Sequence, residues 1–360
     1  MTESVLDAIP EDRRETVRSA IASTFGRAQP NAIEQITRGA SGALIYRLDV
    51  GNRAYLLRLE PRRGNFDPND AGYACMRTAA EAGIAPALHY ADAASGVAIM
   101  DFVASQSLFD HPCGREGLLR GLGMLIAELQ ATSPFPAAAD YPVLIADLLR
   151  GLAESGRFTQ GLLDPHREGL RRLTEAYSWD SSATVSSHND LNPNNILFDG
   201  ERLWLVDWEL AFRNDPLIDV ANLTNYLAPT PELGDVLLKS WHGREPEPPL
   251  RAKLLLARQF VRLGYACLTL TVSAGAAGEE PDGELRAPSL AEFHSAIAQG
   301  RMRMSARESI SPVWKGVPQR VPEQSVLAGI RGSVGNITSG IGSSGEHSAD
   351  LDAKVKALRS

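Results

Sequence analysis

Three polar residues set around two short apolar runs constrain the fold of this chain more than any other feature of its sequence. Asn195 follows Asp190 by five positions, and Asp207 stands at the end of the second apolar run. The runs, Ile196–Phe198 and Leu203–Val206, have the length and composition of strands, and the Asp-Gly pair between them is a hairpin turn signal. A hairpin would hold the three polar groups on rigid backbone, close to one another.

The same three residues have the layout of a phosphoryl-transfer site. A carboxylate such as Asp190 can accept a hydroxyl proton or orient that hydroxyl, while Asn195 and Asp207 offer the oxygen ligands that Mg²⁺ prefers. We therefore expect Asp190 to be catalytic and the other two to bind Mg²⁺. The competing interpretation is a polar turn in front of a hairpin, because an isolated His-x-Asp is common.

The composition is that of an ordinary globular protein. The chain has 360 residues, 44% hydrophobic and 22% charged, which is too long for one small core. The net charge is −8, and no run of Lys or Arg is present, so we expect no nucleic-acid partner.

Cysteine spacing and apolar stretches bear on location. Cys75, Cys113 and Cys267 are far apart, which favours reduced thiols over a disulfide framework or a zinc site. The acidic N-terminus has no signal-peptide pattern. The most apolar stretch, residues 254–274, is interrupted by charged and polar residues, which argues against a membrane span. We expect a cytoplasmic protein.

Periodicity predicts an α+β protein with two lobes. A helix over residues 11–26, three strands between Ile33 and Leu59, a helix over 69–83 and a buried strand at Ala98–Met100 would form a small β-rich N-lobe, residues 1–103. Helices then dominate a C-lobe, residues 104–324, and are expected at 115–131, 143–155, 164–176, 217–227, 231–241, 249–275 and 289–308. The Gly/Ser-rich residues 325–360 cannot bury enough apolar surface, and we expect a flexible tail there.

A glycine-containing segment between two strand-like runs is a candidate phosphate loop. Gly39 and Gly42 would let backbone N–H groups approach phosphate oxygens, and Ser41 adds a hydroxyl donor. A plain hairpin turn is the commoner meaning of such a segment. Its position ahead of the Asp190 segment favours the phosphate loop.

The segment His188-Asn189-Asp190-x-x-x-x-Asn195, together with Asp207, resembles the catalytic segment of the choline/ethanolamine kinase and aminoglycoside phosphotransferase superfamily. The Trp208-Glu209 pair after Asp207, followed by Phe212 and Asn214-Asp215-Pro216, looks closer to the bacterial choline-kinase type than to antibiotic kinases. The resemblance covers roughly residues 30–310. It implies the protein-kinase-like fold, with a small antiparallel β N-lobe and a larger, mostly helical C-lobe. It also implies ATP as co-substrate and Mg²⁺ as cofactor. His188 would then hold the backbone of the loop.

Arg58 is a single cation in an apolar run, and a buried unpaired charge is costly, so it needs a partner. The resemblance implies that Arg58 contacts the nucleotide phosphates; the alternative is an edge strand with Arg58 in solvent. Protein kinases pair this cation with a Glu on the following helix, but that slot falls near Gly72. Asp70 and Glu81 are the nearest carboxylates, so either the helix is offset or Arg58 is held in another way.

The resemblance implies roles for two further parts of the sequence. Met100, Asp101 and Val103 correspond to the hinge, where adenine would bind the backbone of Asp101 and Val103; the alternative is a plain strand-to-helix link. Asp219 would hydrogen-bond the catalytic loop, which is a structural role.

The acceptor is expected to be a small hydroxylated, amine-bearing molecule. Ammonium groups bind aromatic faces and carboxylates. Residues of these kinds cluster after Asp207, at Trp208, Glu209, Phe212 and Asp215. The aromatic residues can equally belong to the core, and Asp215 can be a helix N-cap.

These residues predict an ATP-dependent small-molecule kinase that acts on an amino alcohol such as choline or ethanolamine. One alternative is an aminoglycoside phosphotransferase. Another is a nucleotide-binding pseudokinase, which the missing helix Glu would favour. A protein kinase is the least expected, because no Asp-Phe-Gly to Ala-Pro-Glu segment follows Asp207. Nothing in the sequence predicts the oligomeric state.

Overall fold

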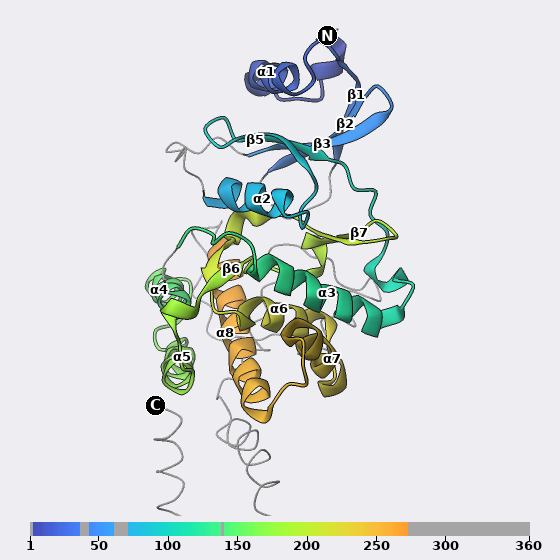
Figure 1. Ribbon diagram of the computed structural model, residues 1–360. Helices are drawn as coiled ribbons and strands as arrows, with labels where there is room; N and C mark the ends of the chain where they lie inside the picture. Colours follow the sequence, from blue (N-terminus) through green and yellow to red (C-terminus); the bar gives the residue numbers. More distant parts are fainter. Residues whose placement is uncertain (1–2, 37–42, 61–70, 138–139, 273–360) are drawn as a thin grey trace, which may run out of the picture. The chain divides into compact units, whose positions relative to one another are not determined.

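The computed structural model describes residues 3–36, 43–60, 71–137 and 140–272 (Figure 1). The candidate phosphate loop with Gly39, Ser41 and Gly42 lies outside these residues. So do Asp70, the helix expected at 289–308 and the tail expected at 325–360. The chain divides into two compact units, Met1–Ala138 with Ala183–Glu245, and Ala139–Ser182 with Pro246–Ser360. The lobe boundary expected after residue 103 stays a prediction.

The first unit contains a five-stranded antiparallel sheet in the order β1-β2-β3-β5-β4. The three strands expected between residues 33 and 59 are confirmed, and β2 and β3 are joined by a tight turn at Gly51, whose φ of 62° suits glycine. The strands are β1 Pro30–Ile36, β2 Leu44–Val50, β3 Arg53–Leu59, β4 Leu88–Asp92 and β5 Val97–Asp101. The sequence analysis did not predict β4.

One face of this sheet is covered by the N-terminal helices. Helix α1, Arg14–Phe25, follows a short 3-10 helix at Glu11–Arg13, and Figure 1 shows α1 over the sheet. Its residues Val17, Ala20 and Ile21 share one buried cluster with Tyr55, Leu57, Leu59 and other residues of the sheet. Because side chains alternate along a strand, Arg58 must lie on the opposite face of β3.

Helix α2, Ala71–Glu81, lies on that opposite side of the sheet (Figure 1). The hairpin expected just before Asp207 is confirmed: β7, Ile196–Phe198, pairs with β8, Leu203–Leu205. A second small pair, β6 Val185–Ser187 with β9 Phe212–Asn214, was not predicted.

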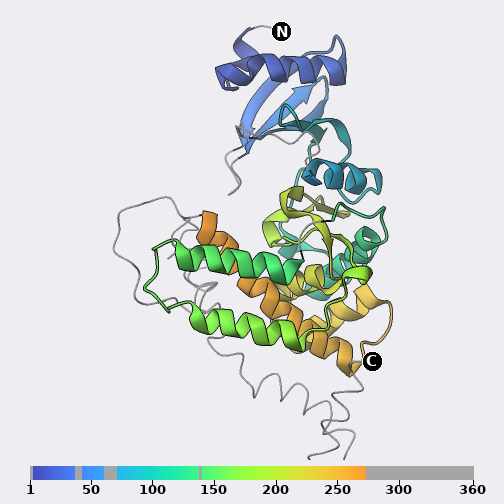
Figure 2. The same ribbon diagram turned by 90° about the vertical axis from the view of Figure 1, so that its left-hand side faces the viewer.

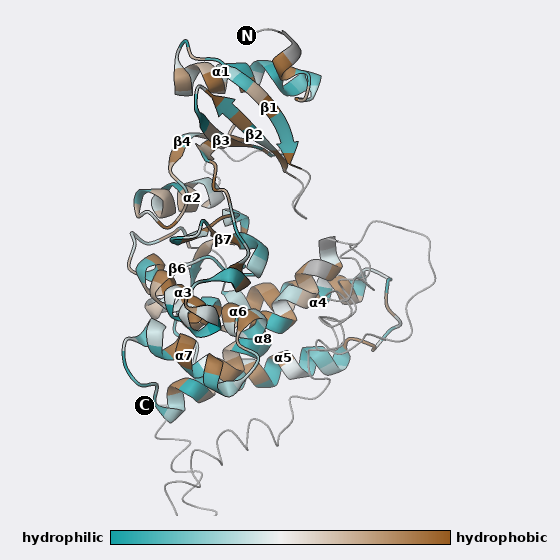
Figure 3. Ribbon diagram, turned by 90° about the vertical axis from the view of Figure 1, so that its right-hand side faces the viewer, coloured by the Kyte–Doolittle hydropathy of each residue, from teal (hydrophilic) through white to brown (hydrophobic). Residues whose placement is uncertain are grey.

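Three helices complete the unit: α3 Gly114–Gln130, α6 Leu217–Leu227 and α7 Pro231–His242. Both α3 and α7 carry hydrophobic and hydrophilic residues (Figure 3), as expected for helices that bury one face.

The second unit is helical in its described part. Helix α8, Pro248–Val272, packs against α4, Tyr141–Glu154, and α5, Asp164–Ala176 (Figure 2). Aromatic residues pack beside these helices. The ring centroid of Phe260 in α8 lies 5.4 Å from that of Tyr177 and 5.7 Å from that of Trp179. The helices match those expected from the sequence, with ends that differ by a few residues. No helix among the described residues is both long and apolar enough to cross a membrane.

Candidate active site

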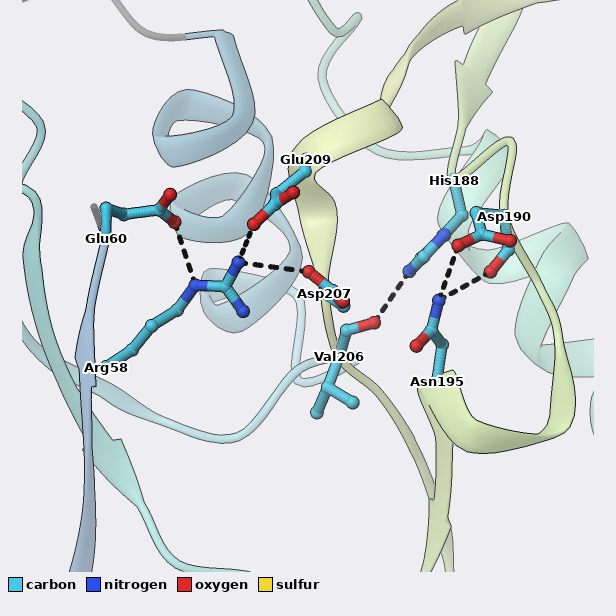
Figure 4. Close-up of polar contacts among 8 residues, drawn as sticks. All are labelled: Arg58, Glu60, His188, Asp190, Asn195, Val206, Asp207 and Glu209. Carbon is cyan, nitrogen blue, oxygen red and sulfur yellow. Dashed lines mark hydrogen bonds and ion pairs between the residues drawn. The ribbon is translucent and has the colours of Figure 1, made fainter. Parts of the chain in front are cut away.

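A buried carboxylate on α6 fixes the loop that begins at His188. Asp219 accepts hydrogen bonds from the backbone N–H groups of His188 and Asn189, both at 2.8 Å. The ring of His188 donates from Nε2 to the carbonyl oxygen of Val206 at 2.9 Å (Figure 4). The loop is thereby tied both to α6 and to the residue that precedes Asp207. The contacts expected for Asp219 and His188 are present.

The backbone is unusual at two places in this site. Among the described residues other than glycine, only Asn189 and Asp207 have positive φ, at 65° and 70°. Such conformations are unfavourable for residues with a Cβ atom and concentrate at functional sites. Asn189 immediately precedes Asp190, the expected catalytic carboxylate, and Asp207 is itself an expected Mg²⁺ ligand.

An amide hydrogen-bond network supports Asn189 in this conformation. Its Nδ2 donates to the carbonyl oxygen of Leu210 at 2.9 Å, and its Oδ1 accepts from Nδ2 of Asn214 at 2.7 Å. Its carbonyl oxygen accepts from Nδ2 of Asn222 at 3.2 Å. Asn and Asp are the residues that best tolerate a left-handed backbone, and here the side chain also supplies the bonds that hold it.

Asp190 and Asn195 lie in direct contact, as their spacing predicts. Nδ2 of Asn195 donates to the carbonyl oxygen of Asp190 at 2.8 Å and to its Oδ2 at 2.9 Å (Figure 4). Asn192 donates to the other carboxylate oxygen at 3.1 Å. Burial raises the pKa of Asp190, and the hydrogen bond from Asn192 acts in the opposite direction. The carboxylate is thus held in one orientation by two amides.

The oxygen atoms available here fit Mg²⁺. Since Nδ2 of Asn195 is committed to Asp190, its carbonyl oxygen Oδ1 turns to the side of Asp207 (Figure 4). Oδ1 of Asp207 is buried and makes no hydrogen bond among the described residues, although it lies 3.1 Å from Arg58 Nη2. The described residues contain no group of three or more His, Cys, Asp or Glu arranged to hold a metal. Mg²⁺ sites of this type need only one or two protein carboxylates, with phosphates and water as the other ligands.

Arg58 joins the sheet to this site. Its side chain is only 12% exposed on a central strand, so the interpretation as a solvent-facing edge residue is wrong. Nε donates to Oε1 of Glu60 at 2.9 Å, and Nη2 pairs with Asp207 and with Glu209 (Figure 4). Burial alone would lower the pKa of Arg58, but the three carboxylates Asp207, Glu60 and Glu209 raise it.

The carboxylate Glu60 was missed in the sequence analysis. Of the two carboxylates considered as partners of Arg58, Glu81 is an exposed residue at the end of α2, and Asp70 lies outside the described residues. Glu60 stands two positions after Arg58, and that spacing places both side chains on one face of an extended chain. The same spacing was the sequence signal that could have found it.

The residues predicted to form the hinge lie at the end of β5 and just after it. Met100 and Asp101 are the last two residues of that strand, and Val103 follows. The backbone N–H of Asp101 already donates to the carbonyl oxygen of Ala87 at 2.9 Å, so it cannot also serve adenine. The carbonyl oxygen of Asp101 and the backbone of Val103 remain the predicted contacts.

The candidate acceptor residues make mostly structural contacts. Trp208 is buried, with its ring 4.7 Å from His188 and 6.0 Å from Phe135, which favours a core role. Asp215 is buried and accepts from the backbone N–H of Leu217 at 2.9 Å, as an N-cap does. Phe212 is half-buried in β9, and Glu209 pairs with Arg58.

A family model confirms the phosphotransferase family that was expected from the resemblance of the His188–Asn195 segment. The model of the phosphotransferase enzyme family matches residues 32–254, more than half of the chain. The protein belongs to this family.

Curated relatives match only a short part of the chain. Protein LicA of Haemophilus influenzae is 41% identical over 54 residues, which are 15% of this chain and 20% of the relative. The chain matches only a fifth or less of the length of such curated relatives.

Solved structures establish the fold. A choline/ethanolamine kinase family protein from Mesorhizobium loti has a TM-score of 0.62 and 23% identity, over 88% of this chain and 98% of that one. A spectinomycin phosphotransferase solved with ADP and spectinomycin has a TM-score of 0.55 and 12% identity, over 85% and 98% of the two chains. These similarities confirm the protein-kinase-like α+β fold expected from the sequence.

Proposed function

We propose that this protein transfers the γ-phosphoryl group of ATP to a hydroxyl of a small amine-bearing alcohol such as choline or ethanolamine. The observation that carries the proposal is the contact chain from Arg58 to Asp207 on one side and from Asn195 to Asp190 on the other. These contacts support the proposal because they bring together a buried cation, the two side chains proposed to bind Mg²⁺ and the carboxylate proposed as general base. A cytoplasmic location is part of the proposal.

Asp190 acts on the acceptor. Held by Asn192 and Asn195, its carboxylate receives or orients the hydroxyl that attacks the γ-phosphorus. Because the transition state of phosphoryl transfer is loose, catalysis is mostly positioning and electrostatics, which suits a carboxylate whose rotation is restricted.

Asn195, Asp207 and Arg58 act on the nucleotide. Asn195 and Asp207 would hold Mg²⁺, which neutralises phosphate charge when bound. Arg58 supplies the protein's own cation beside them, and Gly39, Ser41 and Gly42 would add backbone and hydroxyl donors. The hinge residues Met100, Asp101 and Val103 would receive adenine.

The acceptor class rests on the resemblance of the Asp207-Trp208-Glu209 segment to bacterial choline kinases. Glu209 pairs with the same nitrogen of Arg58 as the proposed metal ligand Asp207, and its side chain is 39% exposed. An aminoglycoside acceptor is the second candidate, because a spectinomycin phosphotransferase shares the fold. A pseudokinase loses its main support, since Glu60 supplies a carboxylate for Arg58.

The test is release of ADP across a panel of choline, ethanolamine, simple sugars and aminoglycosides, with Mg²⁺ present. We expect turnover with an amino alcohol. Asp190→Ala should lower that turnover by about 10²–10⁴-fold while MgATP binding changes little. Near-normal turnover by Asp190→Ala would remove the assignment of Asp190, and turnover with aminoglycosides alone would select the second candidate.

A further inference from the structure

The guanidinium of Arg58 meets carboxylates along two different edges. Glu60 takes the single N–H of Nε at 2.9 Å, whereas Asp207 and Glu209 both lie at Nη2 (Figure 4). A guanidinium is planar, so a partner at Nε fixes the direction in which the Nη groups point. The contact with Glu60 therefore sets the orientation of the whole group.

Glu60 is itself held firmly. Its N–H donates to the carbonyl oxygen of Gly96 at 2.9 Å, which continues the pairing of the sheet past the end of β3. Its carbonyl oxygen accepts from Nη1 of Arg13 at 2.6 Å, and Nη2 of Arg13 donates to the carbonyl oxygen of Ser95 at 2.7 Å. Arg13 is only 6% exposed. A cation from the N-terminal segment thus anchors the residue that orients Arg58.

The other two carboxylates are placed differently. Asp207 is a proposed Mg²⁺ ligand, so its charge is committed to the metal when nucleotide is bound. Glu209 is 39% exposed, compared with 10% for Glu60. Of the three partners, only Glu60 combines a buried side chain with a role outside the proposed metal site.

We propose that Glu60 is a positioning residue of the nucleotide site. It holds Arg58 by Nε so that the Nη edge faces the triphosphate, and it takes the part that a Glu on the following helix takes in protein kinases. The inference rests on the proposed function, because it requires that the site binds MgATP.

The matched control lies on the adjacent strand. Asp49 accepts from Nε of Arg47 at 2.9 Å, also two positions apart, on β2. That pair is more exposed, at 42% and 31% for the two side chains. Glu60→Gln and Asp49→Asn therefore remove the same kind of charge from the same kind of pair.

The experiment measures MgATP binding by calorimetry without acceptor, so that it does not depend on turnover. Glu60→Gln should weaken binding by about tenfold, because the neutral amide oxygen accepts a weaker hydrogen bond from Nε than a carboxylate does, and Asp49→Asn should leave binding unchanged. In an Arg58→Met background, Glu60→Gln should have no further effect on binding, because Glu60 acts through Arg58. Thermal unfolding of each variant checks the fold, and Glu60→Asp, which withdraws the carboxylate but keeps the charge, replaces Glu60→Gln if that variant does not fold.

Unchanged binding in Glu60→Gln, or an equal loss in the Arg58→Met background, would overturn the positioning role. If the wild-type protein binds MgATP but phosphorylates no acceptor, the proposed function fails while the binding cycle still decides the role of Glu60. A wild-type protein that does not bind MgATP would overturn both.

Discussion

Asn189 shows how a single residue stabilises a strained loop. Its φ of 65° is unfavourable for a residue with a Cβ atom, and its side chain bonds to Leu210 and Asn214 on segments that flank the site. The cost of the backbone conformation and the gain from the amide bonds can be separated by substitution, because glycine removes both and alanine removes only the bonds.

We predict that Asn189→Ala lowers the free energy of unfolding by about 2 kcal/mol through the loss of its side-chain hydrogen bonds, because the positive φ is the same in both proteins. Asn189→Gly should be about 1 kcal/mol more stable than the Ala variant, since glycine adopts positive φ freely. Urea denaturation of the two variants measures the difference. Equal stability would mean that the loop relaxes and stores no strain at this position.

At the scale of elements, α3 and α7 approach so closely that a glycine is required between them. A Cβ atom added at Gly123 would lie 2.8 Å from Cβ of Ser240 and 2.9 Å from both the carbonyl oxygen of Leu237 and the backbone nitrogen of Trp241. Two of these neighbours are backbone atoms, which cannot move aside cheaply. The helix pair would have to separate.

We therefore predict that Gly123→Ala destabilises the protein by about 1–3 kcal/mol through overpacking. Gly151 in α4 is the control, because a Cβ atom there would meet nothing within 4 Å. Gly151→Ala should stabilise by about 0.5–1 kcal/mol, the ordinary gain of alanine in a helix. Chemical denaturation measures both, and effects of the same sign would contradict the packing argument.

Helix α5 carries a buried histidine that makes stability depend on pH. Burial lowers the pKa of His166, so the folded protein keeps this ring neutral where the unfolded chain, with an ordinary pKa of about 6.5, begins to bind a proton. The stability associated with the neutral ring is complete above that pKa and is lost as the pH falls below it.

The expected result is a lower thermal unfolding midpoint at pH 5.5 than at pH 7.5, with a smaller decrease in a His166→Gln variant. Scanning calorimetry across this range measures both proteins. If wild type and variant lose stability in parallel, other groups control the acid response.

The elements also show what the sequence could predict. Long helices such as α3, α5 and α6 were predicted because their periodicity and end signals lie within one segment. Strands β6 and β9 have three residues each and pair across an intervening hairpin. Nothing local in Val185–Ser187 or Phe212–Asn214 specifies that pairing, so these strands could not be predicted.

The contacts of the candidate site also include some that the sequence could predict and others that it could not. The contact between Asp190 and Asn195 follows from spacing within one loop, and it was predicted. The contact of Arg58 with Asp207 joins residues far apart in the chain and follows only from the fold. The assignment of Trp208 to an ammonium site depended on its residue type, its position after Asp207 and the resemblance of that segment, and its contacts with His188 and Phe135 could not be read from the sequence.

At the scale of the whole molecule, nucleotide binding should raise global stability. A ligand that binds only the folded state stabilises it by about 2.7 kcal/mol at a concentration one hundred times its Kd. We predict that MgATP raises the unfolding midpoint and that excess EDTA removes most of the increase, because Asn195 and Asp207 are the residues that would hold the Mg²⁺ of the bound nucleotide. Thermal shift of wild type and Asp207→Asn measures this, and an equal shift in both would place the metal elsewhere.

The N-terminal segment contributes to the same whole. Residues of α1 share the buried cluster of the sheet, and Arg13 fixes the backbone of Glu60. The proposed nucleotide site therefore depends on residues that lie outside the matched family region, residues 32–254.

The short spacing of Arg58 and Glu60 has an evolutionary consequence. A cation whose partner stands on a separate helix keeps that partner only while the intervening loop and the helix retain their length and register. A pair two positions apart on one extended segment is inherited as a unit and is unaffected by insertions in residues 61–70 or by rotation of α2. A single-residue insertion between the two would instead place them on opposite faces of the sheet. Descendants of this chain can therefore change the length of residues 61–70 without losing this ion pair, provided that the three residues from Arg58 to Glu60 stay contiguous.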